Sequence, residues 1–278
     1  MDIPPLSVDA EIDAAAARDL LAAAAREAGA LALEYFRLGA RTSAQVETKV
    51  GGSPVTNADL AADSLLKRRL REALPDAGWL SEETVDDFER LSRRSLVIVD
   101  PIDGTRAFVI GDPRWAVSAA LIIDGRPIAG VVHAPALDET YAAARGAGAT
   151  FNGATLTAGV GWPPRAAAGP KPIVEAIAAT LGLALEIVPR VPSLAYRLCM
   201  AARGAVDFAV AAENSHDWDI AAADLLLEEA GARLIGASGE RLLYNARQVR
   251  RGALLAASEA AAPRLIEAFR VAIGRRAN

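Results

Sequence analysis

Two carboxylates and a hydroxyl follow one another in the segment Asp100-Pro101-Ile102-Asp103-Gly104-Thr105. Carboxylate oxygens are the ligands that hard divalent cations prefer, and backbone N–H groups at the start of a helix favour anions. The segment could therefore hold a cation and a phosphate group together. The same residues also fit an ordinary Asp-Gly turn with solvated aspartates, so the rest of the chain must decide between the two interpretations.

Three further segments place acidic residues beside predicted element ends: Thr56-x-x-Asp59, Ser81-Glu82-Glu83 and His216-Asp217-Trp218-Asp219. The spacing of Thr56 and Asp59 is that of a capping box, and a helix dipole favours an aspartate in its first turn, as expected for Asp219. Acidic runs such as 82–87 are also common in solvated loops. These structural roles are compatible with catalysis and do not exclude it.

The elements that must position these residues can be predicted from apolar patterns. Leu96–Val99 is a run of four apolar residues, which predicts a strand buried on both faces that ends at Asp100, because Pro101 lacks an N–H group. Two apolar runs joined by Asp124-Gly125 predict an antiparallel hairpin. Helices are predicted at residues 9–38, 56–74, 173–181, 193–203, 219–229 and 263–273, and further strands at 115–123, 127–133, 140–144, 184–188, 206–211, 232–235 and 253–257.

The character of these elements changes near residue 158. The first part reads as α+β with antiparallel strands, and the second part alternates helices and strands as α/β proteins do. A stretch rich in Pro and Gly, Gly159–Pro172, is interpreted as the link. We therefore expect an α+β lobe at residues 1–158, which carries most of the acidic segments, and an α/β lobe at 159–278, which contributes Asp219.

Composition narrows the classes of function. A net charge of −5, from 35 acidic and 30 basic residues, provides no basic field for a nucleic-acid polymer. One cysteine excludes an intrachain disulfide and fits a cytoplasmic protein, and two histidines disfavour a Cys/His zinc site. No signal-peptide pattern is evident, and no apolar run approaches the roughly 18 residues of a membrane span, so we expect no membrane partner.

Together, the four acidic segments resemble in type and order the motifs of the inositol monophosphatase-like family of magnesium-dependent, lithium-sensitive phosphatases. The specific part is the 100–105 string combined with Trp218-Asp219 at the head of a helix. The resemblance covers roughly residues 15–258. It implies a layered αβαβα sandwich of the α/β class, a cytoplasmic phosphoric monoester hydrolase that uses Mg²⁺ to activate water, and a homodimer.

The resemblance also implies roles for individual residues. Thr105, oriented by Asp59, would accept or relay a proton from the attacking water, and the N–H groups of Gly104 and Thr105 would hold the phosphate. Glu82 is preferred over Glu83 as a ligand. The implied Mg²⁺ ligands are Glu82, Asp100, the carbonyl of Ile102, Asp103 and Asp219, and the implied substrate contacts are Asp103, Gly104, Thr105, Ser193, Tyr196 and Asp219.

Two segments bear on the identity of the substrate. Ser53-Pro54-Val55-Thr56 and the 193–196 region look most like bacterial 3′(2′),5′-bisphosphate nucleotidases, which remove the 3′-phosphate of adenosine 3′,5′-bisphosphate. A phosphatase of inositol 1-phosphate or of another polyol or sugar phosphate is the alternative, and a regulatory protein that binds a macromolecular partner is the non-enzyme alternative. The region after the link shapes the leaving-group pocket in the family, and its candidates here are Arg165, Lys171, Ser193, Tyr196 and Arg197.

Overall fold

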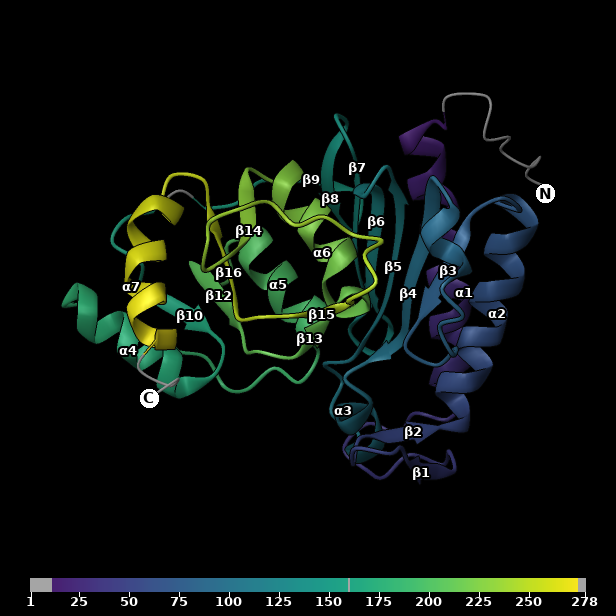
Figure 1. The fold of residues 1–278 in the computed structure, drawn as a ribbon. Coiled ribbons are helices and arrows are strands. Elements are labelled where there is room, and N and C mark those ends of the chain that lie inside the picture. The colour runs from purple at the N-terminus through teal and green to yellow at the C-terminus, as the bar shows by residue number, and fades with distance from the viewer. Residues whose placement is uncertain (1–11, 160, 275–278) are drawn as a thin grey trace.

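Two β-sheets lie on either side of a pair of helices in the computed structural model, which describes residues 12–159 and 161–274 (Figure 1). Helices α5 and α6 fill the space between the sheets, α1 and α2 cover the outer face of the larger sheet, and α4 and α7 cover the outer face of the smaller one. These five layers confirm the predicted αβαβα sandwich. The helices are α1 Ala14–Leu33, α2 Asn57–Ala73, α3 Thr105–Ile110, α4 Lys171–Leu181, α5 Leu194–Ala202, α6 Asp217–Glu229 and α7 Ala262–Gly274, with short 3-10 turns η1 Glu89–Ser92 and η2 Pro135–Leu137.

The larger sheet has seven strands in the order β3-β4-β5-β6-β7-β8-β9, and only β3 and β4 run parallel within it. The smaller sheet has the order β11-β10-β12-β16-β14. Two short ribbons, β1–β2 and β13–β15, complete the pairing among the described residues. The strands are β1 Val46–Thr48, β2 Pro54–Thr56, β3 Gly78–Ser81, β4 Ser95–Asp103, β5 Ala116–Ile123, β6 Arg126–Ala134, β7 Glu139–Ala144, β8 Gly148–Phe151, β9 Ala154–Leu156, β10 Ala166–Ala168, β11 Glu186–Ile187, β12 Phe208–Ala211, β13 Ser215–His216, β14 Ala232–Gly236, β15 Arg250–Arg251 and β16 Leu254–Ser258.

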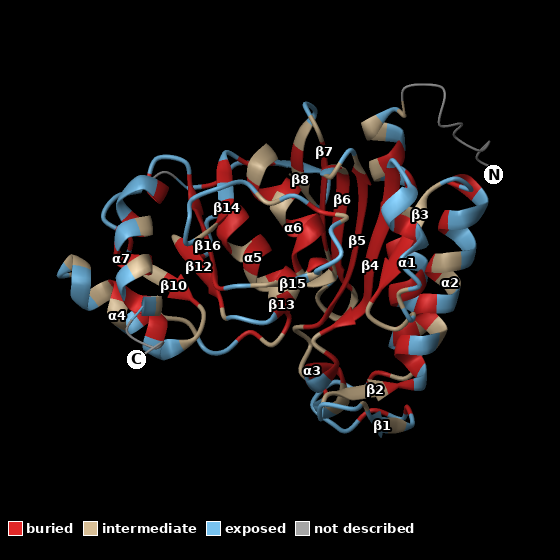
Figure 2. Ribbon diagram, in the orientation of Figure 1, coloured by how far each residue is buried: buried red, intermediate tan, exposed pale blue. Residues whose placement is uncertain are grey.

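Strand β4 is buried along its whole length (Figure 2). Leu96 and Ile98 belong to the core between the sheets, whereas Val97 and Val99 pack on the side of α1 and α2. A strand with apolar neighbours on both faces needs no polar alternation, which explains the continuous apolar run in the sequence.

The prediction that this strand ends at Asp100, before Pro101, is wrong. The strand continues to Asp103, with a shift of register against β5 between Asp100 and Asp103. An irregularity of this kind leaves residues outside the regular ladder, so the missing N–H group of a proline costs no hydrogen bond there. Because of the shift, the side chains of Asp100 and Asp103 do not follow the regular alternation between the two faces of the sheet.

Two other predicted boundaries need correction. Helix α1 ends at Leu33 and not at Leu38, because the carbonyl of Tyr35 accepts a hydrogen bond from the Thr42 hydroxyl (2.8 Å) in the loop that follows. The predicted start at residue 9 lies outside the described residues. In the predicted link, β10 (Ala166–Ala168) pairs in parallel with β11 and β12, and so short a run of alanines carries no strand signal.

The sheets divide the chain near the predicted point, since the larger one uses residues 78–156 and the smaller one residues 166–258. Helix α6 nevertheless packs against strands of both sheets. The division into lobes at 1–158 and 159–278 therefore stays a prediction. Among the described residues, no helix combines the length and the apolar character needed to cross a bilayer.

Helix α6 lies very close to β6 at Gly130. A Cβ atom at this position would lie 2.9 Å from the carbonyl oxygen of Ala222 and 3.1 Å from its Cα atom, so the helix backbone itself occupies the space. Glycine thus sets the distance between α6 and the larger sheet. Because Asp219 is on the same helix, this contact also fixes the distance of its carboxylate from the larger sheet.

We expect Gly130→Ala to lower the free energy of unfolding by about 1–3 kcal/mol, because the added methyl group forces the helix away from the sheet. Urea denaturation measures the change. Gly252→Ala is the matched control, since a Cβ atom there meets nothing within 4 Å, and its effect should stay within about 0.5 kcal/mol. Equal stability of the two variants would contradict this account of the packing.

Candidate active site

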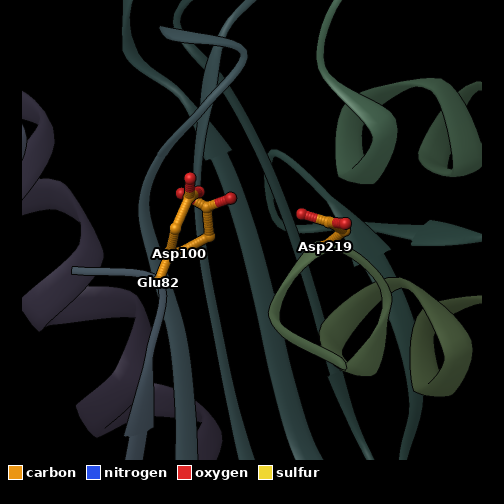
Figure 3. Close-up of side chains that lie close together, drawn as sticks. All are labelled: Glu82, Asp100 and Asp219. Atoms are coloured by element: carbon orange, nitrogen blue, oxygen red, sulfur yellow. The ribbon is translucent and has the colours of Figure 1, made fainter. Parts of the chain in front are cut away.

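Three carboxylates from three elements meet at one edge of the larger sheet (Figure 3). Glu82 follows β3, Asp100 lies in β4, and Asp219 lies in the first turn of α6. One oxygen atom of each lies within 4.8 Å of the others. Because β3 and β4 run parallel, with Ser81 beside Val99, the residues that follow these two positions reach the same edge.

Backbone N–H groups fix the orientation of two of these carboxylates. Asp100 Oδ1 accepts a hydrogen bond from the N–H of Ile102 (3.0 Å), across the irregular part of β4. Asp219 Oδ2 accepts one from the N–H of His216 (2.7 Å), as part of the cap of α6. The prediction that Asp219 lies in the first turn of a helix is therefore confirmed, and its capping bond also directs the carboxylate toward the other two.

Asp103 also lies in β4, but its hydrogen-bond partners are at the start of α5. Its Oδ2 atom accepts hydrogen bonds from the Ser193 hydroxyl and from the N–H of Ala195, both at 2.6 Å. The next residue, Gly104, has φ +93°, and a Cβ atom there would lie 3.1 Å from the Ser193 nitrogen. Glycine is required both by the left-handed backbone and by this close approach. Ser193 thus reaches the site as a hydrogen-bond partner of an aspartate.

Asp59 and Thr105 form a buried pair beside this cluster. The capping box predicted from the sequence is present, because Asp59 Oδ2 accepts hydrogen bonds from the N–H (2.8 Å) and the hydroxyl (2.6 Å) of Thr56. The other oxygen, Oδ1, lies 3.2 Å from the Thr105 hydroxyl, which is also 3.1 Å from the carbonyl oxygen of Ile102. One proton on Thr105 can satisfy only one of these two acceptors at a time.

Burial and mutual repulsion raise the carboxyl pKa values at the site. The pKa values of Asp100 and Asp219 are raised well above the ordinary value, first by burial and then by the neighbouring negative charges. Burial also raises the pKa of Asp103 to about 6 and that of Asp59 to about 6, although hydrogen bonds to both carboxylates act in the opposite direction. Such an assembly of oxygen donors suits a hard divalent cation, which would offset the repulsion.

Lys49 is a residue of the site that sequence reasoning missed. Its ammonium nitrogen lies 2.8 Å from Glu82 Oε1 and 2.7 Å from Glu83 Oε1, so it connects the loop between β1 and β2 to the acidic segment. Burial raises the pKa of Glu83 to about 7, against the effect of Lys49. Of the two glutamates, only Glu82 is within 4.8 Å of both Asp100 and Asp219 among the described residues. A lysine in a glycine-containing loop gives no signal from which this contact could be predicted.

Comparison with known proteins gives a consistent assignment. The model of the inositol monophosphatase family matches residues 13–273. The chain belongs to this family of phosphatases. It is 36% identical to a histidinol-phosphatase of Mycobacterium tuberculosis (80% of this chain, 88% of that protein) and 29% identical to a 3′(2′),5′-bisphosphate nucleotidase CysQ of Aggregatibacter actinomycetemcomitans (77% and 84%). The structure of an inositol monophosphatase of Thermotoga maritima superposes with a TM-score of 0.78 at 27% identity (92% and 98%).

A hollow of about 770 Å³ lies at the start of α4 and beside α5, and its lining extends to Pro192, the residue before Ser193. Three cationic side chains line it, those of Lys171, Arg190 and Arg197. Arg197 donates a hydrogen bond to the carbonyl of Val191 (3.0 Å). Burial lowers the pKa of its guanidinium, and the carboxylates of Asp103 and Asp219 act in the opposite direction. The hollow is therefore a cationic space beside an anionic cluster.

Tyr196 and Arg165, two of the candidates for the leaving-group pocket, do not line this hollow. Tyr196 is buried, packs edge-on against Tyr141 and donates its hydroxyl to Glu139 Oε2 (2.9 Å). A contact between Tyr196 and a purine would require this side chain to leave the core. Arg190, which sequence reasoning did not single out, lines the hollow instead.

The raised pKa values predict how the metal-free protein responds to pH. A carboxyl group with a raised folded pKa contributes stability that is present below its ordinary pKa of 3.8 and is lost as pH rises through the folded value, about 6 for Asp59 and Asp103. In excess chelator we expect Tm to fall as the pH rises from about 4, near the ordinary pKa, to about 7, just above the folded values of Asp59 and Asp103. Calorimetry should also show that Asp100→Asn raises Tm at the upper pH, because one buried charge is removed.

Asp76→Asn serves as the control for this experiment, since Asp76 is exposed in a turn and its replacement should leave the pH dependence unchanged. A decrease in Tm for Asp100→Asn at the upper pH would mean that Asp100 acts as an ordinary structural contact. The proposed repulsion would then be wrong.

Proposed function

We propose that this protein is a Mg²⁺-dependent phosphomonoesterase that hydrolyses a small phosphate ester, with the 3′-phosphate of adenosine 3′,5′-bisphosphate as the preferred target. The observation that carries the proposal is the convergence of Glu82, Asp100 and Asp219 beside the buried pair of Asp59 and Thr105. A cluster of acidic groups and a hydroxyl with its own carboxylate partner are the components needed to bind a phosphate through cations and to take a proton from water.

Glu82, Asp100 and Asp219 face one another, and the family resemblance adds Asp103 and the carbonyl of Ile102 as ligands. Glu82 and Asp100 would share one Mg²⁺ with the carbonyl of Ile102, and Asp100, Asp103 and Asp219 would hold a second, with Asp100 common to both. When bound, two Mg²⁺ ions supply positive charge for the phosphate oxygens and lower the pKa of water. The absence of sulfur ligands and the predominance of carboxylates favour Mg²⁺ over softer metals.

Proton transfer is assigned to Thr105 and Asp59. In this scheme the Thr105 hydroxyl accepts a hydrogen bond from the attacking water and donates its own proton toward Asp59 Oδ1, at 3.2 Å. The capping box holds Asp59 in place through its other oxygen, so Oδ1 remains directed at Thr105. A pKa raised to about 6 by burial lets this carboxylate take up a proton near neutral pH. The N–H groups of Gly104 and Thr105 are assigned to the phosphate.

The cationic hollow is evidence for a substrate whose leaving group carries a second negative charge. Lys171, Arg190 and Arg197 would attract the 5′-phosphate of adenosine 3′,5′-bisphosphate. Inositol 1-phosphate offers only hydroxyl groups to the same space, and the cationic amine of histidinol phosphate would be repelled there. Charge therefore favours the bisphosphate among these three substrates. A cytoplasmic location and a homodimer stay predictions.

A regulatory protein of the same fold is the other class of function considered. Such a protein would have no need to keep all of its buried carboxylates, because each raises the electrostatic cost of folding. Glu82, Asp100, Asp103 and Asp219 are all present with Thr105, and this supports an enzyme.

The reaction is tested by phosphate release with Mg²⁺. We expect activity with Mg²⁺, none in excess chelator, and poor support from Ca²⁺, whose longer bonds misplace the reacting groups. Thr105→Ala should lower kcat by a factor of roughly 10² or more, whereas Thr105→Ser keeps the hydroxyl and should retain most of the rate. Full activity in chelator, or equal rates for the alanine and serine variants, would contradict the mechanism.

The substrate is tested by a comparison of kcat/KM for adenosine 3′,5′-bisphosphate, inositol 1-phosphate and histidinol phosphate. We expect the bisphosphate to have the highest value. Arg190→Ala should raise KM for the bisphosphate about tenfold and leave inositol 1-phosphate unaffected, because only the former has a second phosphate to pair with the guanidinium.

Arg165→Ala is the matched control, because Arg165 is also exposed but does not line the hollow. A higher kcat/KM for inositol 1-phosphate would reject the nucleotide assignment and leave the metal mechanism untouched. A loss of activity toward both substrates in Arg190→Ala would mean that the arginine supports the fold of the site and not the leaving group.

A further inference from the structure

A second basic hollow, of about 200 Å³, lies between α2, β3 and the segment 84–93. It is lined by the side of α2 that carries Lys67 and Arg71, by Gly78 and Trp79 at the start of β3, and by residues of the η1 region that include Arg93. The proposed ligand Glu82 follows the opposite end of β3. The hollow is therefore separate from the acidic cluster and from the cationic hollow beside Arg197.

Four cations line this hollow, and among the described residues three of them have no acidic partner: Lys67, Arg71 and Arg93, but not Arg90. Arg69 pairs with Glu27, and Arg90 is bound to Asp86 (2.7 Å). Within residues 12–159 and 161–274, Lys67, Arg71 and Arg93 make no salt bridge and no side-chain hydrogen bond. Three positive charges therefore surround one small space without compensation from a neighbouring side chain.

Two acidic residues also border the hollow, Asp87 and Glu89. Asp87 Oδ1 already accepts a hydrogen bond from the N–H of Glu89 (3.0 Å), and Glu89 is exposed to solvent. Neither residue is paired with Lys67, Arg71 or Arg93 among the described residues. An incoming anion would thus compete with water for the three cations and not with an existing ion pair.

Trp79 supplies the apolar wall of the hollow. Trp79 is 8% exposed, and the Lys67 ammonium lies 6.0 Å from the centroid of its ring. The ring limits the positions open to the lysine side chain, so its charge stays near the hollow. A tetrahedral oxyanion that meets one ammonium and two guanidinium groups would have charge-assisted hydrogen bonds from three sides.

We propose that this hollow binds a phosphate-type oxyanion, either free or as the phosphate group of a small molecule, at a site separate from the catalytic one. Its wall includes Thr84 and Val85, which come directly after Glu82 and Glu83. Asp63 connects these positions, because it accepts hydrogen bonds from the hydroxyls of Ser81 (2.5 Å) and Thr84 (3.0 Å). An anion in the hollow therefore stabilises the segment that presents Glu82 to the acidic cluster.

Binding is tested with inorganic phosphate in excess chelator, where the carboxylate cluster without cations repels anions. Isothermal titration of the full chain should show a phosphate site that persists in Arg190→Ala and therefore does not lie in the hollow beside Arg197, with chloride at matched ionic strength as the reference. Arg71→Ala should weaken phosphate binding about tenfold or more, because one charge-assisted contact is lost. Arg68→Ala, on the same helix but outside the hollow, should bind phosphate as the wild type does.

Titration with glycerol phosphate distinguishes the two sources of the anion. Binding of both compounds, with the same loss in Arg71→Ala, supports a site open to phosphate esters, and binding of inorganic phosphate alone supports a site for the free ion. No binding by the wild type, or equal binding by Arg71→Ala and Arg68→Ala, overturns the proposal. Because the titration contains no Mg²⁺, its outcome is independent of whether the chain hydrolyses phosphate esters.

Discussion

Repulsion between buried carboxylates is the constraint on which the site depends. Asp100 and Asp103 are buried and Asp219 is half-buried within one small region, and their negative charges raise one another's carboxyl pKa values. The fold tolerates this arrangement because each of the three carboxylates also accepts a hydrogen bond from a backbone N–H group, so none depends on an acidic neighbour for its position. The scaffold thereby holds the charges together before any cation binds.

The layered architecture explains how distant segments supply these groups. The parallel pair of β3 and β4 directs Glu82 and Asp100 to one edge of the larger sheet, and α6 brings Asp219 to it from between the sheets. The start of α5 closes the arrangement, because Ser193 and Ala195 bind the carboxylate of Asp103. The site is therefore shared between both halves of the sequence, and its geometry depends on the close packing of α6 on Gly130.

Much of this could be predicted from the sequence where the signal was local. The capping box at Thr56 and Asp59, the hairpin at Asp124-Gly125 and the buried run of β4 are properties of short segments, and the structure contains all three. The family motifs indicated the layers. Contacts between distant segments were not predictable, since the reach of Lys49 to Glu82 and the burial of Tyr196 against Tyr141 depend on tertiary packing. Strand β4 beyond Pro101 was missed because pairing with β5, and not local preference, decides its length.

The capping box has a consequence for how this chain can diverge. Asp59 serves the fold through one oxygen, which binds Thr56, and faces Thr105 through the other. A descendant that lost its catalytic role would still need the first oxygen to begin α2. Selection for folding alone would then preserve an aspartate here, so the presence of Asp59 in a relative is weaker evidence of activity than the presence of Asp100, whose buried charge the fold alone gives little reason to keep.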